Sequence, residues 1–177
     1  MVRYRRNFVP GGTFFFTVTL ADRRSNALVA HIRTLRTAFR ITRRERLFSV
    51  EAFVVLPDHL HTIMTLPEGD ADFSGRWRRI KGLFSRSVAA RERVSPNLKG
   101  EYRLWQRRFW EHTIRDDDDF GRHFDYFHFN PVRHGLVTRV RDWPHSSFHL
   151  FVRRGWLPRD WGGDMAESRM RFGEPVE

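Results

Sequence analysis

Two histidines, His59 and His61, stand one residue apart in the stretch 54–66, VVLPDHLHTIMTL. The pattern is typical of an apolar strand, a turn at Pro57 and Asp58, and a second strand that begins at His59. Because side chains alternate across a strand, both imidazoles lie on one face, and Leu60 points into the layer behind. Such a pair can bind one divalent cation from a rigid support. The alternative is a half-exposed strand that carries two polar side chains, and the pair alone does not decide between them.

A helix is expected after Ile114, where four aspartates, residues 116–119, precede an aromatic stretch. Carboxylates at a helix N-terminus satisfy free N–H groups and the helix dipole, and we favour this interpretation over a metal-binding acidic run. We expect the helix to end at Phe129 or Asn130, because Pro131 disfavours helical backbone in the residue before it.

Along this helix Phe120, Phe124 and Phe127 form the packing stripe. Tyr126 and Asn130 are four residues apart on another stripe, with His123 beside them. If the helix crosses the open face of the sheet, Asn130 could add an oxygen ligand to the histidine pair. His123 competes with Asn130 as this third ligand, and the spacing does not separate them.

Tyr126 would supply a nucleophilic oxygen at the same place. The chain has three tyrosines. Tyr4 falls in a basic arm and Tyr102 in a loop, so Tyr126 is the tyrosine that a regular element positions. A buried structural tyrosine with a satisfied hydroxyl is the alternative.

The strands and helices that must position these residues can be predicted from the sequence, and their order along the chain indicates the fold. Strands are expected at 13–20, 48–56, 59–66 and 109–114, and helices at 25–46 and 72–93, from their apolar periodicity. The order βαββαβ predicts an α+β, ferredoxin-like antiparallel sheet with both of these helices on one face. We expect one domain over residues 1–177, made of a basic arm (1–12), this core (13–115), the tyrosine helix (116–134) and a C-terminal tail (135–177).

Charge points to a nucleic-acid partner. Lysine and arginine number 32 against 21 acidic residues, a net charge of +11, and only Lys81 and Lys99 are lysines. Arginine binds phosphate in a bidentate manner and stacks on bases, although a biased genome could also supply arginine in place of lysine. The candidates for contacts to a DNA backbone are Arg3, Arg5, Arg6, Arg79, Arg86, Arg93, Arg153 and Arg154. Trp105, Phe109 and Trp110 could stack on unpaired bases, with core packing as the alternative.

Other features narrow the class of protein. The absence of cysteine excludes disulfides, thiolate metal sites and a cysteine nucleophile. No apolar signal core or membrane-length run occurs, so we expect a cytoplasmic protein without a membrane partner.

Four motifs carry a specific resemblance: LPDHLHTIMTLP, WQRRFWEHTIRDDDDF, DYFHFNPVRHGLV and DWPHSSF. In this order they resemble the REP-associated tyrosine transposases of the single-tyrosine HUH superfamily, over about residues 4–161. The resemblance implies that His59, His61 and Asn130 bind Mg²⁺ or Mn²⁺ and that Tyr126 is the nucleophile. Phe129 departs from relatives that often have a second tyrosine there, which leaves Tyr126 as the sole candidate in its segment.

The implied activity is cleavage and rejoining of single-stranded DNA at REP-type hairpins, through a 5′-phosphotyrosine and without a nucleotide cofactor. The resemblance also favours a monomer. A binding module for structured nucleic acid, which holds DNA without cutting it, fits the charge equally well. A third hypothesis is a metal-dependent hydrolase that uses activated water, although no acidic residue flanks the histidines in metalloprotease spacing.

Overall fold

A four-stranded antiparallel sheet forms the centre of the molecule. The structure is a computed structural model and describes residues 7–93, 95–98, 100 and 102–162. The strands are β1 (Thr13–Thr19), β2 (Ser49–Val55), β3 (His59–Thr65) and β4 (Trp110–Thr113), in the spatial order β2-β3-β1-β4. Each neighbouring pair is antiparallel. With helices between β1 and β2 and between β3 and β4, this order confirms the predicted ferredoxin-like arrangement.

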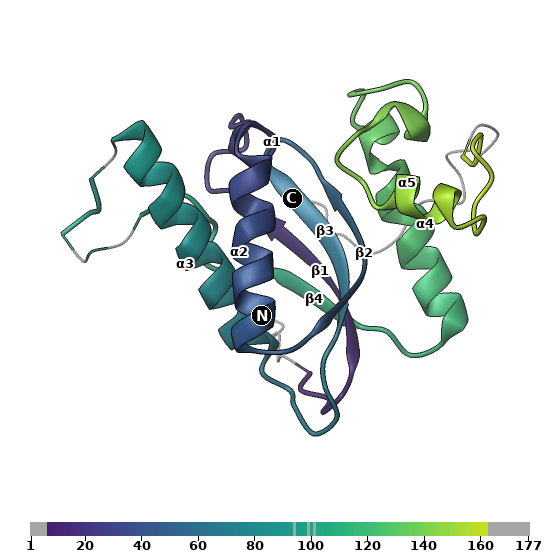
Figure 1. The fold of residues 1–177 in the computed structure, drawn as a ribbon, viewed down its shortest axis with the longest axis horizontal. Coiled ribbons are helices and arrows are strands. Elements are labelled where there is room, and N and C mark those ends of the chain that lie inside the picture. The colour runs from purple at the N-terminus through teal and green to yellow at the C-terminus, as the bar shows by residue number, and fades with distance from the viewer. Residues whose placement is uncertain (1–6, 94, 99, 101, 163–177) are drawn as a thin grey trace, which may run out of the picture.

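One face of the sheet is covered by the helices α1 (Ala27–Ala30), α2 (Ile32–Glu45) and α3 (Phe73–Glu92) (Figure 1). Leu60 and Met64 of β3, with Leu66 directly after it, lie in the core on this side, as the alternation predicts. They pack with side chains from β1 and the helices, among them Phe14, Phe16, Leu35, Trp77, Ile80 and Phe84. This buried apolar layer supplies the main driving force that holds the sheet against α2 and α3.

The single helix expected over residues 25–46 is wrong in one respect, because the structure divides it at His31. The backbone of His31 has φ −110° and ψ 32°, which ends α1 before α2 begins. The side chain of His31 lies 2.8 Å from Glu92 at the end of α3. This tertiary contact has no counterpart in the local periodicity from which a continuous helix was predicted.

Helix α3 begins with a capped turn and a buried arginine. The carboxylate of Asp72 accepts a hydrogen bond from the backbone N–H of Gly75, which satisfies one free donor of the first turn. Arg76 is only 1% exposed. Its guanidinium donates to Asp70 at 2.7 and 3.1 Å and to the carbonyl oxygen of Leu47. A charge this deeply buried is tolerated because its donors are paired.

Replacement of Arg76 by methionine is expected to lower the free energy of unfolding by about 2–3 kcal/mol, because Asp70 and the Leu47 carbonyl lose their partner. Urea denaturation measures the change. Arg91→Met is the control, since Arg91 is exposed on the same helix and such surface changes cost about 0.5 kcal/mol or less. A loss below about 1 kcal/mol for Arg76→Met would show that these hydrogen bonds contribute little.

The opposite face of the sheet is covered by α4 (Asp117–Arg133) and the short α5 (Phe148–Arg153). The carboxylate of Asp116 accepts a hydrogen bond from the backbone N–H of Asp119 at 2.7 Å, so the capping role expected of the aspartate run is present. Phe127 is buried against Phe15 of β1, at a ring distance of 6.0 Å, and Phe120 and Phe124 pack around it. The packing stripe of the tyrosine helix is therefore the predicted one.

The expected end of this helix at Phe129 or Asn130 is wrong, because the helix continues through Pro131 to Arg133. Proline has a helical φ and lacks only its N–H, so one hydrogen bond is lost and the last turn still forms. Gly135, with φ +66°, then ends the helix. Its N–H binds the carbonyl of Val132 while that of Leu136 binds the carbonyl of Pro131, which is a Schellman motif.

The segment after α4 is fastened to the free edge of β2. The backbone of Phe53 accepts from the N–H of Ser147, and the N–H of Val55 donates to the carbonyl of His145. The Ser147 hydroxyl lies 3.0 Å from Nε2 of His128 on α4, which ties that helix to the same edge. The 3₁₀ helix η1 (Val140–Asp142) precedes this contact. Within the described part of the chain, the helices are all too short or too polar to span a bilayer.

Candidate active site

The two predicted histidines lie side by side on the face of β3 that α4 covers. Their ring centres are 5.0 Å apart and the rings are nearly perpendicular, at 84°. Both side chains are buried, which corrects the expectation that the pair sits on an open face available to a substrate. The cause is α4, which packs directly over them.

Each histidine is held through its Nδ1 atom. His59 Nδ1 lies 2.8 Å from a carboxylate oxygen of Asp58, and the other oxygen of Asp58 accepts from Arg23 at 2.7 Å. His61 Nδ1 lies 2.9 Å from the hydroxyl of Thr17. With the proton on Nδ1 in both rings, the lone pairs are on Nε2. This is the arrangement in which an outer hydrogen bond orients a metal-binding imidazole.

Helix α4 brings Tyr126 and Asn130 to this pair. The Nδ2 of Asn130 lies 2.6 Å from Nε2 of His61, and the ring of Tyr126 is 5.7 Å from the His61 ring. Asn130 is 1% exposed and its Oδ1 has no hydrogen-bond partner. Tyr126 is 5% exposed, and its ring lies edge-on to that of Phe15 at 6.4 Å. The one-turn spacing of Tyr126 and Asn130 thus places both beside His61, as the sequence predicts.

Burial and nearby charges set the protonation of His61 and Asp58. Burial lowers the pKa of His61 well below its usual value, and the positive charges of His59, His134 and Arg23 lower it further. Burial alone would raise the pKa of Asp58, but the hydrogen bond and charge of His59, with Arg23, hold it below its usual value. A neutral imidazole is the form in which histidine binds a metal, and burial favours that form for His61.

The unpartnered side-chain oxygen of Asn130 and the nearby Nε2 of His61 suit a divalent cation. A half-turn of the Asn130 amide would place its unpartnered Oδ1 close to the lone pair of His61 Nε2. Two acceptors that face each other repel unless a cation lies between them. Ligand atoms of Mg²⁺ at about 2.1 Å lie roughly 3 Å apart, a spacing close to that of these two groups. His59, His61 and Asn130 could therefore hold Mg²⁺ or Mn²⁺.

The exposed edge of the site carries two residues that sequence reasoning missed. The Arg133 guanidinium lies 5.7 Å from the centre of the Tyr126 ring, and the His134 ring lies 5.2 Å from that of His59. Both residues are exposed at the end of α4. Their position follows from the continuation of the helix through Pro131, so a helix that stopped at Asn130 gave no signal for them.

His123, the competing third ligand, lies in a different group. Its Nδ1 is 2.8 Å from the backbone carbonyl of Asp119, and its ring stacks on His112 of β4 at 4.5 Å. The Asp119 carboxylate lies 2.8 Å from His112 Nε2. Possible ligand atoms of His112, Asp119 and His123 lie within 4.8 Å of one another. These contacts join the start of α4 to β4, whereas it is Asn130 that reaches His61.

The arginines proposed from sequence that the structure describes are divided between the two faces of the sheet. Arg3, Arg5 and Arg6 lie outside the described residues. Arg79, Arg86 and Arg93 lie along α3 and its C-cap, on the other face of the sheet (Figure 1). Both oxygens of Glu45 accept from Arg79 at 2.6 and 2.7 Å, so its charge is already paired. Arg153 and Arg154 are exposed at the end of α5, and Arg154 lies 5.0 Å from the centre of the Trp156 ring.

Comparisons with known proteins agree with this fold and these motifs. The chain is 47% identical over 167 residues to a REP-associated tyrosine transposase of Escherichia coli, with 94% of each chain covered. It is 44% identical to a putative REP-associated tyrosine transposase of Haemophilus influenzae, covering 93% of this chain and 95% of that one. A solved structure of a REP-associated tyrosine transposase bound to a REP hairpin superposes with a TM-score of 0.85 at 46% identity, covering 100% of this chain and 99% of that one. No protein-family model matches the chain.

These identities, over nearly the full length of both chains, decide the family. The chain belongs to the REP-associated tyrosine transposases, as the motifs predicted.

Proposed function

We propose that this protein cleaves and rejoins single-stranded DNA at REP-type hairpins through a 5′-phosphotyrosine on Tyr126. The observation that carries the proposal is the meeting of Tyr126 and Asn130 with His61 across 65 or more residues of sequence. Its support is the resemblance in name and fold to a transposase solved with a REP hairpin. Hairpin DNA is accordingly the proposed partner.

Tyr126 is the proposed nucleophile. Its phenol oxygen attacks the scissile phosphorus as the bond from phosphorus to the 3′ oxygen breaks. The phenol gives up its proton and the 3′ oxygen takes one, so a 3′-hydroxyl leaves and the 5′ phosphate stays on the tyrosine. The reverse attack by a second 3′-hydroxyl rejoins the strand, because the covalent link retains a phosphodiester.

His59, His61 and Asn130 are the proposed ligands of Mg²⁺ or Mn²⁺. When bound, such a cation supplies charge neutralisation and orientation of a phosphoryl oxygen. Asp58 and Thr17 hold the two imidazoles with Nε2 toward the centre. Arg133 can stabilise negative charge on the phenol and phosphate, since its guanidinium lies over the Tyr126 ring.

DNA must enter a site that is nearly closed. Tyr126 and both histidines are buried, and the neighbouring exposed residues are Arg133 and His134. We therefore place the approach of the scissile phosphate at the C-terminal end of α4. Movement of the Arg133 side chain would uncover the Tyr126 ring without a change in the sheet.

The test is a denaturing gel of the full chain incubated with a hairpin oligonucleotide that carries an unpaired flank, with Mg²⁺ or Mn²⁺. A metal-dependent band of covalent protein–DNA adduct, with a free 3′-hydroxyl on the released piece, is expected. Cut DNA without adduct would indicate activated water instead. Tight binding without any cut would indicate the binding module.

Thr17→Val is expected to weaken Mn²⁺ binding about tenfold, because His61 loses the hydroxyl that orients it. Isothermal titration calorimetry on the DNA-free protein measures the change. Thr13→Val is the matched control, since Thr13 is also on β1 and its hydroxyl binds Thr65 at 2.9 Å, with no histidine involved. Equal affinities for the two variants would contradict a supporting role for Thr17.

A further inference from the structure

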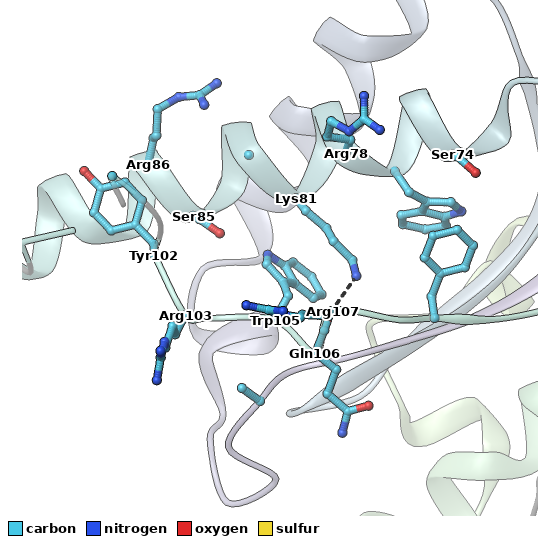
Figure 2. Close-up of a pocket in the computed structure, with 15 residues that line it drawn as sticks. Ser74, Arg78, Lys81, Ser85, Arg86, Tyr102, Arg103, Trp105, Gln106 and Arg107 are labelled. Atoms are coloured by element: carbon cyan, nitrogen blue, oxygen red, sulfur yellow. Dashed lines mark hydrogen bonds between the residues drawn. The ribbon is translucent and has the colours of Figure 1, made fainter. Parts of the chain in front are cut away.

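A cavity of about 840 Å³ lies between α3 and the segment made of Gly100 and residues 102–109, on the sheet face opposite to α4. Its volume is within the usual range of ligand pockets. Figure 2 shows its two walls, the helix with Arg78, Lys81 and Arg86, and the extended segment with Tyr102, Trp105 and Gln106. The candidate cleavage site contributes none of its lining residues.

The chemistry of the lining is cationic and aromatic together. Its charged side chains are Arg78, Lys81, Arg86, Arg103 and Arg107, and none of the described lining residues is acidic. Four of these five, the arginines, are exposed at the rim. A cluster of one sign, without carboxylates to neutralise it, attracts a polyanion.

Aromatic rings form the floor. Lys81 crosses the gap, donates to the carbonyl of Gln106 at 3.0 Å, and lies 5.7 and 5.4 Å from the ring centres of Trp105 and Phe109 (Figure 2). Trp77, fully buried, and Trp105 both line the cavity with indole N–H groups that have no hydrogen-bond partner. Flat rings, unused donors and a fixed ammonium suit a heteroaromatic base attached to a phosphate.

We propose that this cavity binds an unpaired DNA nucleotide, with its base against Trp105 and Tyr102 and its phosphate near Lys81 and Arg86. This inference deepens the proposed function, because it assumes that DNA is the partner. Duplex DNA buries its base faces in the stack, so the aromatic surface selects single strands. The cavity is a second DNA contact that holds the substrate from the far side of the sheet and takes no part in the chemistry.

Gly82 offers a way to block the cavity without removal of a charge. A Cβ on Gly82 would meet Nη1 of Arg86 at 3.3 Å, the far end of a flexible side chain. Gly82→Leu therefore fills the cavity at little strain, and it improves the helix propensity of α3 by up to about 1 kcal/mol. Ser87→Leu is the matched control, since it adds the same side chain at an exposed position of the same helix outside the lining.

The test is fluorescence anisotropy with a labelled thymidine oligonucleotide of about 12 nucleotides, in the presence of EDTA. Gly82→Leu is expected to weaken its binding at least about tenfold, the loss of one or more stacked bases, while Ser87→Leu stays within about twofold. Arg86→Glu should weaken it more than Arg43→Glu, the same charge change on exposed α2. Parent-like affinity in Gly82→Leu, or equal effects of the two glutamate variants, would overturn the proposal.

This binding assay separates the inference from the proposed function. It contains no metal and forms no covalent bond, so it does not depend on Tyr126. A lost affinity in Gly82→Leu together with absent adduct in the parent would retain the nucleotide site and remove the cleavage mechanism. Normal affinity in Gly82→Leu together with a normal adduct in the parent would retain the cleavage mechanism and remove the nucleotide site.

Discussion

Tyr126→Phe is expected to abolish the covalent protein–DNA adduct, a loss of about a thousandfold or more. The substitution removes one oxygen and leaves the ring, which packs edge-on to Phe15 and His61. Affinity for hairpin DNA should therefore stay within about twofold of the parent, and the thermal midpoint should remain close to the parent value. The measurement is the denaturing gel described above, with the binding isotherm recorded on the same preparation.

Phe129 provides the control for this result. It is three residues from Tyr126 on α4 and lines a separate small cavity with Val132 and Val140, away from the histidines. The double variant Tyr126→Phe, Phe129→Tyr restores a phenol to the helix at the wrong side, so we expect no adduct. Adduct in Tyr126→Phe alone would show that another residue is the nucleophile, and rescue in the double variant would show that α4 can rotate.

The site was predictable from sequence where local geometry sets it. A strand has a period of two, which fixes His59 and His61 on one face. A helix has a period of 3.6, which fixes Tyr126 with Asn130 and directs Phe127 to the core. The order of apolar segments was enough for the ferredoxin-like sheet, because few topologies satisfy it.

Side chains that meet because of the register between two strands could not be predicted from the periodicity of the sequence. Thr17 supports His61 because β1 and β3 pair with those two residues opposite each other, and the register is a property of the folded sheet. The choice between Asn130 and His123 as the third ligand also depends on the folded structure, because it requires knowing which strand each residue faces. About two turns of α4 separate Asn130, which reaches His61 of β3, from His123, which contacts His112 of β4. Periodicity along the helix does not say which strand lies beneath each turn.

Tertiary ion pairs decide which arginines of α3 can still bind DNA. Arg79 is one of the arginines predicted from sequence to contact a DNA backbone, yet Glu45 of α2 pairs with it. The neighbouring Arg76 is buried on Asp70. A helix stripe predicts which residues share a face, but the charges on the facing helix decide whether that face remains basic.

His61→Ala is expected to cause the second large loss, more than about a hundredfold in Mn²⁺ affinity and a matching loss of adduct. The His61 side chain contacts two other residues of the site, Thr17 through Nδ1 and Asn130 through Nε2. EDTA should have the same effect on the parent, and added Mn²⁺ should restore the parent but not the variant.

His61→Ala also removes a buried hydrogen-bonded ring, which costs about 1–3 kcal/mol of stability. A lost adduct could then result from unfolding, so a second variant that removes a proposed ligand is needed. His59→Ala serves this purpose, because it removes the other proposed ligand while Thr17, His61 and Asn130 keep their contacts. His31→Ala removes an imidazole paired with Glu92 on the far face and should leave metal affinity unchanged. If both site variants fold and still give a metal-dependent adduct at the parent rate, the cation is bound elsewhere, and the group of His112, Asp119 and His123 becomes the next ligand set to substitute.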